Sequence, residues 1–399
     1  MLNNTDDGGT RRASSKRHTK ARTKKRENGL INWVRPVDGK ADYVFLAIVV
    51  LLIAYGIIML FSASNAKAYS TYGDALYFVK RQAVGILIGV VGMVFCAKFD
   101  YHRYGGKIAG ILYAGTAVLL VLVIAGLGST VNGATRWLFG FQPSEIAKIA
   151  IIILFAYNLS RQSGQNDIKN FKKGFLPYML LLLVYVVLLA LEPHFSCIIL
   201  IFATALILIF AAGAPIKHFI YLAIPAIPAI IVLIIKEPYR LQRVISFGDP
   251  FKDMKGSGWQ IAQSLYAIGS GGIFGVGLGQ SRQKFQALPE PQTDFIFSVL
   301  GEELGLVGAI ILMVLFVLLL IRGIKIAANA PDMFGTLLVV GIVGIVVLQA
   351  IINIAVVTAT IPVTGMPLPF FSYGNTALSI TMAEMGIVLN VSKQSRLKV

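Results

Sequence analysis

Long apolar blocks alternate with shorter polar stretches along the chain from about residue 40 onward. The blocks are roughly 17–25 residues long, which is the length that crosses a bilayer as an α-helix. A membrane β-barrel would instead need short segments in which apolar and polar residues alternate. The pattern therefore predicts an all-α polytopic membrane protein with about ten transmembrane helices, at residues 42–61, 83–98, 107–128, 144–160, 175–192, 194–212, 216–235, 295–321, 334–360 and 372–392.

A long polar interval at residues 236–293 separates the seventh and eighth predicted helices. Loops of this length are usually functional or disordered. Within it, residues 258–269 alternate apolar and polar positions at helical spacing, which predicts an interfacial or re-entrant helix. A run of glycines follows between Gly269 and Gly279. It lacks the Gly-Lys-Ser/Thr of a phosphate-binding loop, so we interpret these glycines as positions of close backbone packing.

Charge is scarce and unevenly distributed. Only 14% of the 399 residues are charged while 56% are hydrophobic, and the formal net charge is +17. Much of this charge lies in residues 1–40, which we interpret as a disordered basic cytoplasmic tail that helps to set topology. Such a tail could also contact anionic lipid, nucleic acid or a protein. We favour the topological role and expect no nucleic-acid partner.

The remaining basic residues divide between alternate loops and fit a topology with both termini in the cytoplasm. We therefore predict a transmembrane domain at residues 41–393, with residues 236–293 as its long outer loop, and a cytoplasmic C-terminal tail at residues 394–399. Several basic residues still fall in predicted outer loops, among them Arg136. Basic groups on that face suit an anionic ligand held at the membrane surface.

Asp294 stands where the long polar loop meets the eighth apolar block. An ionisable group at a membrane edge is costly, so it is a candidate for function. The alternative is that Thr293 and Asp294 only cap the N-terminus of a helix, where a hydroxyl and a negative charge are both favourable.

The second predicted outer loop carries a further group of polar residues. Pro143 and Ser144 mark a plausible helix start, and Glu145 and Lys148 are three residues apart, so they share a helix face and can pair. Arg136 could equally snorkel to the headgroups, and Trp137 could be an interfacial anchor. Together these residues place an Arg, a Glu and a Lys on the same predicted face as Asp294.

Three acidic residues lie deeper in the apolar blocks. Glu302 and Glu303 follow Asp294 by about two helical turns, and Glu384 is near the middle of the last predicted helix. Such residues could form a proton pathway. We favour the simpler interpretation, in which they make hydrogen bonds that fix helix packing.

These segments together resemble the SEDS family (shape, elongation, division and sporulation), which includes FtsW, RodA and SpoVE, over about residues 40–395. The branch that includes FtsW fits best. Two departures are Glu192-Pro193-His194-Phe195-Ser196, where Pro-Asp-x-Gly-Thr is usual, and Asn375-Thr376 after Ser372-Tyr373-Gly374. The resemblance is carried by Asn132-Gly133 with Arg136-Trp137, Phe141-Gln142-Pro143-Ser144-Glu145 with Lys148, Gly258-Trp259-Gln260 with Gln263-Ser264, Leu288-Pro289-Glu290 with Thr293-Asp294-Phe295-Ile296-Phe297, Glu302-Glu303-Leu304-Gly305, and Gly365-Met366-Pro367-Leu368-Pro369-Phe370-Phe371-Ser372-Tyr373-Gly374.

The resemblance implies a peptidoglycan glycosyltransferase that polymerises lipid II on the outer face of the bacterial cytoplasmic membrane, with inversion at the anomeric carbon. Asp294 would be the general base for the acceptor hydroxyl. Arg136, Lys148 or cations of the long loop could neutralise the pyrophosphate leaving group. The expected substrate-binding residues are Arg136, Trp137, Glu145, Lys148, Gln260, Gln263, Ser264 and Ser372.

The resemblance also implies partners. The family usually works with a class B penicillin-binding protein and with other division or elongation proteins. A divalent cation, Mg²⁺ or Mn²⁺, could assist, although the sequence shows no dedicated metal site. The alternative function is a transporter, a lipid II flippase. We favour the enzyme because the candidate polar groups gather on one predicted face, whereas a transporter needs a pathway open to both faces in turn.

Overall fold

The computed structural model describes residues 39–131, 134–235, 247, 250–251, 258–286 and 288–395. The basic tail predicted at residues 1–40 lies almost wholly outside these residues, as do Asn132, Gly133, most of residues 236–257 and the end of the C-terminal tail. Each of the ten predicted helices corresponds to a helix of the structure. They are α1 (Tyr43–Tyr72), α2 (Tyr77–Lys98), α3 (Lys107–Leu122), α4 (Pro143–Ser160), α6 (Leu176–Leu191), α7 (Phe195–Ala211), α8 (Ile216–Ile235), α12 (Ile296–Ala328), α13 (Met333–Val357) and α14 (Asn375–Gln394).

The helices are suited to a membrane by length and composition. In the described part of the chain, seven are long and apolar enough to cross a bilayer, and α7 is a shorter apolar helix. The π-helical turns η3 (Val123–Leu127) and η4 (Phe171–Phe175) extend α3 and α6 to spanning length. These features confirm an all-α polytopic membrane protein.

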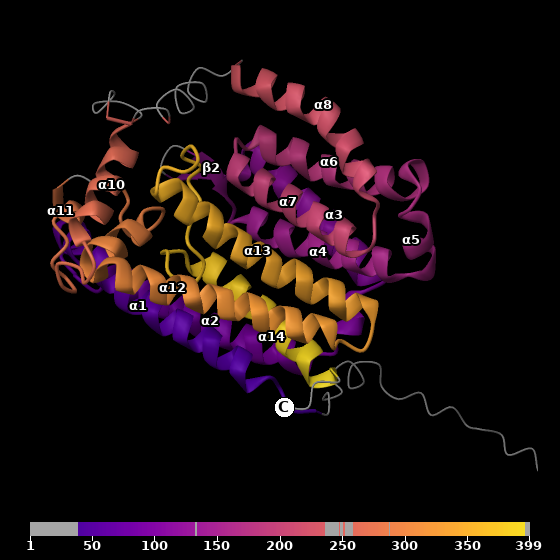
Figure 1. Cartoon of the computed structure of the whole chain (residues 1–399), viewed down its shortest axis with the longest axis horizontal. Coiled ribbons are helices and arrows are strands. Elements are labelled where there is room, and N and C mark those ends of the chain that lie inside the picture. Colours follow the sequence, from indigo (N-terminus) through magenta and orange to yellow (C-terminus); the bar gives the residue numbers. More distant parts are fainter. Residues whose placement is uncertain are drawn as a thin grey trace, which may run out of the picture.

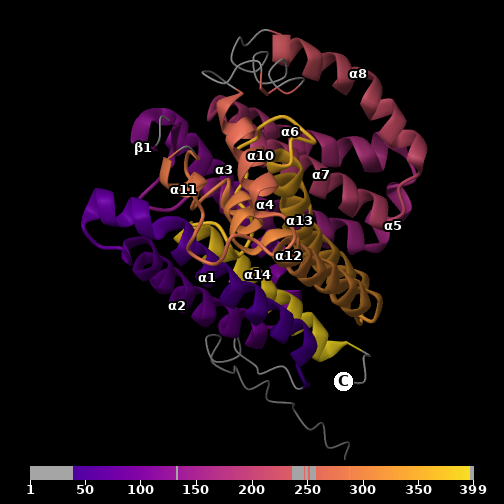
Figure 2. The ribbon, with the colours of Figure 1, turned by 60° about the vertical axis from the view of Figure 1, so that its left-hand side comes forward.

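The long helices run side by side in one bundle (Figure 1). Helix α4 packs against α3, α7 and α13, and α14 packs against α2. Most of α4 is buried inside the protein, unlike the other spans except α13, so α4 lies at the centre of the bundle. Figure 2 shows α8 at the periphery, on the side away from α1 and α2.

The two ends of the bundle differ. At one, called the terminal end here, the beginning of α1 meets the end of α14, because the Asp42 N–H donates to Ser392 Oγ over 3.1 Å. Arg322 Nε donates to the same Asp42 carboxylate over 2.8 Å. At the opposite end, called the loop end, the Gly374 N–H donates to Gln82 Oε1. The loop end also carries α10 (Trp259–Gly271), α11 (Gln283–Gln286) and the strands β1 (Ser129–Val131) and β2 (Ala134–Trp137) (Figure 1).

Two features of the loop end differ from the sequence-based prediction. Helix α1 continues to Tyr72, well past the predicted end at residue 61, because its polar residues find partners there. Ser62 Oγ donates to Glu303 Oε2 over 2.5 Å, and Lys67 Nζ lies 2.7 Å from Glu290 Oε1. The segment between α3 and α4 also contains an unpredicted antiparallel hairpin of β1 and β2.

Helix α12 is interrupted at Gly305, where φ is +64° and the backbone leaves the helical region. A chain break at membrane depth is tolerated only when its polar backbone groups are satisfied by protein or water. Here the glycine-rich stretch after α10 satisfies them, because Leu306 and Val307 donate to the carbonyls of Gly272 and Ile273, while Val276 and Gly277 donate to those of Glu302 and Glu303.

This pairing requires very close backbones. A Cβ atom at Gly275 would lie only 2.1 Å from the carbonyl oxygen of Glu303. The interpretation of the glycine run as a site of close backbone packing is therefore confirmed, and the long loop re-enters the bundle beside α12.

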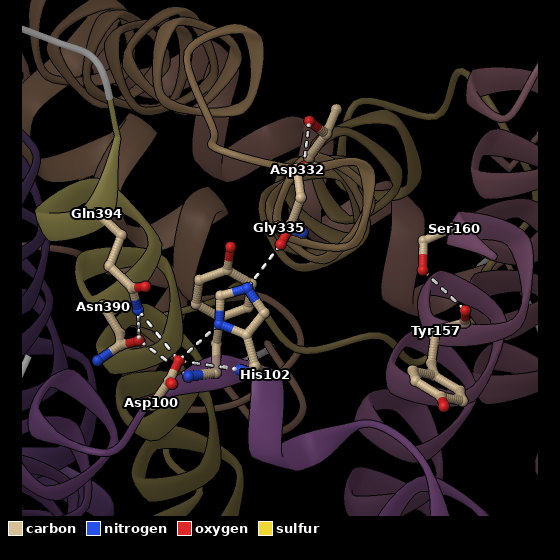
Figure 3. Close-up of polar contacts among 10 residues, drawn as sticks. Asp100, His102, Tyr157, Ser160, Asp332, Gly335, Asn390 and Gln394 are labelled. Atoms are coloured by element: carbon tan, nitrogen blue, oxygen red, sulfur yellow. Dashed lines mark hydrogen bonds and ion pairs between the residues drawn. The ribbon is translucent and has the colours of Figure 1, made fainter. Parts of the chain in front are cut away.

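A polar cluster at the terminal end joins three segments (Figure 3). His102, in the 3-10 turn η2 (Tyr101–Tyr104), lies between two carboxylates, with Nδ1 2.7 Å from Asp100 Oδ1 and Nε2 2.6 Å from Asp332 Oδ2. Asp332 also caps α13 by accepting from the Gly335 N–H, and Gln394 of α14 donates to Asp100. The hydrogen bond to Asp332 raises the pKa of His102 to about 9. Asp100 also raises this pKa, whereas the partial burial of the imidazole lowers it.

This cluster makes thermal stability depend on pH. The pKa of His102 is higher in the folded protein than its ordinary value of 6.5, so its contribution is fully present below about pH 6.5 and is lost as pH rises through about 9. We expect wild type to have a higher Tm than His102→Gln at pH 6, and this difference to shrink toward zero at pH 10. A difference that stays constant over this range would show that charge does not hold the cluster together.

Candidate active site

Asp294 lies in the turn before α12, at the loop end. The N-cap of α12 is Phe295, which makes no side-chain capping bond, and the Thr293 hydroxyl donates to the carbonyl of Glu290 instead. The Thr293 hydroxyl therefore does not cap α12, and the alternative that Asp294 caps this helix stays a prediction. Asp294 is half-buried, and its backbone carbonyl accepts a hydrogen bond from Asn353 Nδ2 over 2.8 Å.

The segment Gly365–Gly374 is tied to the backbone around Asp294. Ser372 is its main tie, because its Oγ donates to the Thr293 carbonyl over 2.6 Å and accepts from the Leu368 N–H over 2.7 Å. The Tyr373 N–H donates to the Gln292 carbonyl over 2.8 Å. Ser372, which the sequence analysis assigned to substrate, is thus part of the framework that fixes Asp294.

Gly365 stands directly before the Asp294 carboxylate. A Cβ atom at Gly365 would lie 3.4 Å from Asp294 Oδ2, and its φ of +70° is unfavourable for any other residue. Gly365 is exposed. The Asp294 carboxylate therefore lies beside the exposed Gly365, and Asn353 holds the Asp294 backbone through its carbonyl.

The predicted pairing of Glu145 with Lys148 is confirmed. Lys148 Nζ lies 2.7 Å from Glu145 Oε2, and both side chains are about nine-tenths buried. Lys148 Nζ also donates to Gln349 Oε1 over 3.3 Å, and Gln349 Nε2 donates to the Pro367 carbonyl over 2.8 Å. The ion pair is therefore connected to the Gly365–Gly374 segment through the side-chain amide of Gln349.

Arg136 lies on β2 and holds the turn between α6 and α7. Its Nε donates to the Glu192 carbonyl over 3.3 Å, and its Nη2 donates to the Pro193 carbonyl. Trp137 ends the same strand, half-buried and paired with Ser129. Burial raises the pKa of the Glu192 carboxyl to about 7, although the nearby Arg136 lowers it in part. Arg136 thus has a structural task at this turn besides any contact with a ligand.

The three candidates on α10 differ in exposure. Gln260 is half-buried, whereas Gln263 and Ser264 are buried. Ser264 Oγ lies 2.7 Å from Ser298 Oγ and donates to the Val357 carbonyl over 2.6 Å. Ser264 therefore connects α10 to α12 at Ser298, four residues after Asp294 in the sequence, and to the end of α13. The substrate-binding role of these residues stays a prediction.

Glu302 and Glu303 anchor the re-entrant loop. Glu302 accepts from the Ser281 hydroxyl over 2.5 Å and from the Arg282 N–H over 2.8 Å. Glu303 lies 2.7 Å from Lys284 Nζ. Both carboxylates are thus held by groups of the loop, which agrees with the packing role that we favoured over a proton pathway.

Sequence reasoning missed Gln349 and Asn353. They are one helical turn apart on α13, and Asn353 Nδ2 donates to both the Asp294 and the Met366 carbonyls, over 2.8 and 2.6 Å. A signal was available, because amides inside an apolar membrane span are uncommon and usually bond to a neighbouring element. No group of three or more His, Cys, Asp or Glu side chains that could hold a metal ion is found within the described residues.

Asn353→Leu should lower the rate of the reaction at this site with little effect on substrate affinity. It removes the donor that holds Asp294 from behind, and an unsatisfied buried carbonyl costs about 1–3 kcal/mol. On the hypothesis that Asp294 is a general base, we expect kcat to fall about tenfold or more while KM stays within a factor of about three, because displacing a base affects the reacting geometry first. Asn390→Leu is the matched control, because it removes a buried amide of α14 that bonds to the Ala97 carbonyl at the terminal end and not to Asp294. An equal loss in both variants would contradict a specific role for Asn353.

The fold and the site define a polytopic helical membrane protein with a fixed carboxylate at one end of its bundle. Comparisons with known proteins agree. The sequence model of the FtsW/RodA/SpoVE family, a family described as "Cell cycle protein", matches residues 42–397 of this chain. This chain belongs to the FtsW/RodA/SpoVE family.

Named relatives share close to the whole chain. Stage V sporulation protein E of Bacillus subtilis (strain 168) is 41% identical, with 89% of this chain and 98% of the relative covered. A probable peptidoglycan glycosyltransferase FtsW of Geobacter sp. (strain M18) is also 41% identical, covering 91% and 99%. Identity alone therefore does not separate the FtsW and SpoVE branches.

Solved structures share the fold. A chain from the structure described as "Structural coordination of polymerization and crosslinking by a peptidoglycan synthase complex" superposes with a TM-score of 0.74 at 27% identity, covering 90% of this chain and 99% of that chain. The rod shape determining protein RodA of Thermus thermophilus gives a TM-score of 0.63 at 26% identity, covering 92% and 100%.

Proposed function

We propose that this chain is a peptidoglycan glycosyltransferase that polymerises lipid II into β-1,4-linked glycan strands, with Asp294 as the general base. The observation that carries the proposal is the Asp294 carboxylate, fixed on its backbone side by Asn353 and facing the exposed Gly365. Relatives that match over most of their length bear the name peptidoglycan glycosyltransferase.

The chemistry suits one fixed carboxylate. The acceptor hydroxyl of one lipid II molecule gives its proton to Asp294 while its oxygen forms a bond to the anomeric carbon of the other. The bond from that carbon to the lipid pyrophosphate breaks, and the pyrophosphate leaves with the electron pair. Inverting transfer needs no covalent sugar–enzyme intermediate, so a second catalytic carboxylate is unnecessary. Arg136 and Lys148 remain the proposed source of positive charge for the leaving group.

The proposed orientation places the loop end outside and the terminal end in the cytoplasm. The beginning of α1 and the end of α14 meet at Asp42 and Ser392. In this orientation both chain termini would lie in the cytoplasm, in agreement with the positive-inside rule. A class B penicillin-binding protein is the proposed partner, in line with the relative found in a complex that coordinates polymerisation and crosslinking.

Purified protein in detergent with lipid II as the sole substrate provides the test. Glycan strands separated on a gel are the expected product, and they cannot arise from a flippase. The absence of glycan, together with movement of lipid II across vesicles that contain the protein, would favour the transporter and overturn the proposal.

A further inference from the structure

Four side chains near the turn between α6 and α7 have buried polar atoms without a hydrogen-bond partner in the described structure. Nearly all buried polar groups in proteins are hydrogen-bonded, so each exception needs an explanation. The Glu192 side chain stands out because neither carboxylate oxygen is bonded although the residue is only 3% exposed. The four sets of atoms are Ser144 Oγ, Glu192 Oε1 and Oε2, His194 Nδ1 and Thr364 Oγ1.

These residues come from distant parts of the sequence but share one neighbourhood. The start of α7 brings them together. Ser196 Oγ donates to the Thr364 carbonyl, and Cys197 Sγ donates to the Ser144 carbonyl over 3.7 Å. Glu192 and His194 belong to the turn that immediately precedes this helix. The unbonded atoms therefore gather where α4, the turn before α7, and the segment leading into Gly365 meet.

The chemistry of this cluster favours a ligand that donates hydrogen bonds. The Arg136 guanidinium donates to the backbone carbonyls of Glu192 and Pro193, and the carboxylate oxygens of Glu192 accept no hydrogen bond in the described structure. The carboxylate oxygens of Glu192 are acceptors, whereas His194 Nδ1 accepts or donates according to its tautomer and the two hydroxyls can take either role. Burial without a donor raises the free energy of the folded protein, and such destabilised groups are typical of binding sites.

The cluster adjoins the candidate general base. Thr364 directly precedes Gly365, whose Cβ position lies 3.4 Å from Asp294 Oδ2. A molecule whose reacting hydroxyl contacts Asp294 could therefore place neighbouring groups near Thr364 and Glu192. Carbohydrates suit this arrangement because adjacent ring carbons carry hydroxyl or amide N–H donors.

We propose that Glu192, with the neighbouring Ser144, His194 and Thr364, forms a sugar subsite that accepts hydrogen bonds from hydroxyl or amide N–H groups of an amino sugar held at Asp294. Glu192 is in this view a binding residue, and it leaves the chemical step to Asp294. The inference rests on the proposed glycosyltransferase function and names a contact to its substrate.

Glu192→Gln separates binding from a structural role. An amide weakens the acceptor and removes the charge, so KM for lipid II should rise about tenfold, the equivalent of one hydrogen bond to a charged group. The Tm should stay unchanged or rise, because an unpaired buried carboxylate is removed. Glu302→Gln is the matched control, since that buried carboxylate is bonded to Ser281 and Arg282 and its loss should lower Tm. A lower Tm with unchanged KM in Glu192→Gln would make Glu192 structural and overturn the proposal.

A binding measurement keeps this test independent of turnover. Lipid II would be titrated into nanodiscs that contain either Asp294→Asn or Asp294→Asn with Glu192→Gln. About tenfold weaker binding by the double variant supports the subsite, and equal binding overturns it. If wild type binds lipid II but makes no glycan, the proposed function fails while this comparison still decides the subsite. Both titrations would be repeated with Mg²⁺ and with a chelator. A defect seen only with Mg²⁺ would assign Glu192 to a cation and overturn the sugar contact.

Discussion

Asp294→Asn should abolish glycan synthesis while leaving folding and membrane insertion intact. The amide keeps the size of the side chain but cannot take the proton of the acceptor hydroxyl. Loss of a general base typically costs about 10²–10⁴ in rate, so we expect no detectable strands on the timescale at which wild type consumes its lipid II. The backbone around Asp294 is held through its carbonyl and those of Gln292 and Thr293, none of which the substitution changes.

The measurement is gel analysis of glycan strands at equal protein concentration, with Tm recorded for each variant. Asp74→Asn is the control, because Asp74 is also an acidic residue between membrane helices but forms an exposed pair with Lys80. It should retain wild-type activity. Synthesis at a near wild-type rate by Asp294→Asn would remove Asp294 from the role of general base.

Much of this architecture was predictable because it depends on local pattern. A bilayer imposes a fixed length on each span, so the apolar blocks located all ten helices. Most of the predicted helix ends lie within a few residues of the ends in the structure. The start of α4 at Pro143 and the ion pair of Glu145 with Lys148 followed from helix-capping preferences and from i,i+3 spacing.

The framework of the site was not predictable in the same way. The break at Gly305 depends on a second backbone segment that comes within hydrogen-bonding distance, and no local pattern specifies that approach. Likewise, the sequence could not show that the hydroxyls of Ser264 and Ser372, both predicted substrate contacts, also bond to backbone carbonyls of other elements. A polar residue in a motif can serve either purpose, and only tertiary contacts distinguish them.

The fully buried ion pair of the re-entrant loop should be the most sensitive point of the fold. Lys284 Nζ lies 2.7 Å from Glu303 Oε1, and neither side chain is exposed. Lys284 Nζ also donates to the Gly279 carbonyl over 2.9 Å and to Ser62 Oγ over 3.3 Å. Lys284 therefore joins α11, the long loop and α1. Sequence reasoning counted the loop cations as candidate contacts for pyrophosphate, and the structure shows that Lys284 also has a structural task in this ion pair.

Lys284→Met should therefore destabilise the protein by about 3–5 kcal/mol, because it leaves the Glu303 charge buried without its partner. The control is Lys67→Met, whose Nζ lies at the same 2.7 Å distance from Glu290 but whose pair is 37% and 40% exposed. That pair should contribute only about 0–1 kcal/mol, because solvent screens it. Thermal unfolding in detergent would show a much larger fall in Tm for Lys284→Met, and adding Glu303→Leu should restore part of it by removing the orphaned charge. Equal shifts in the two single variants would mean that burial does not set the strength of the Lys284–Glu303 pair.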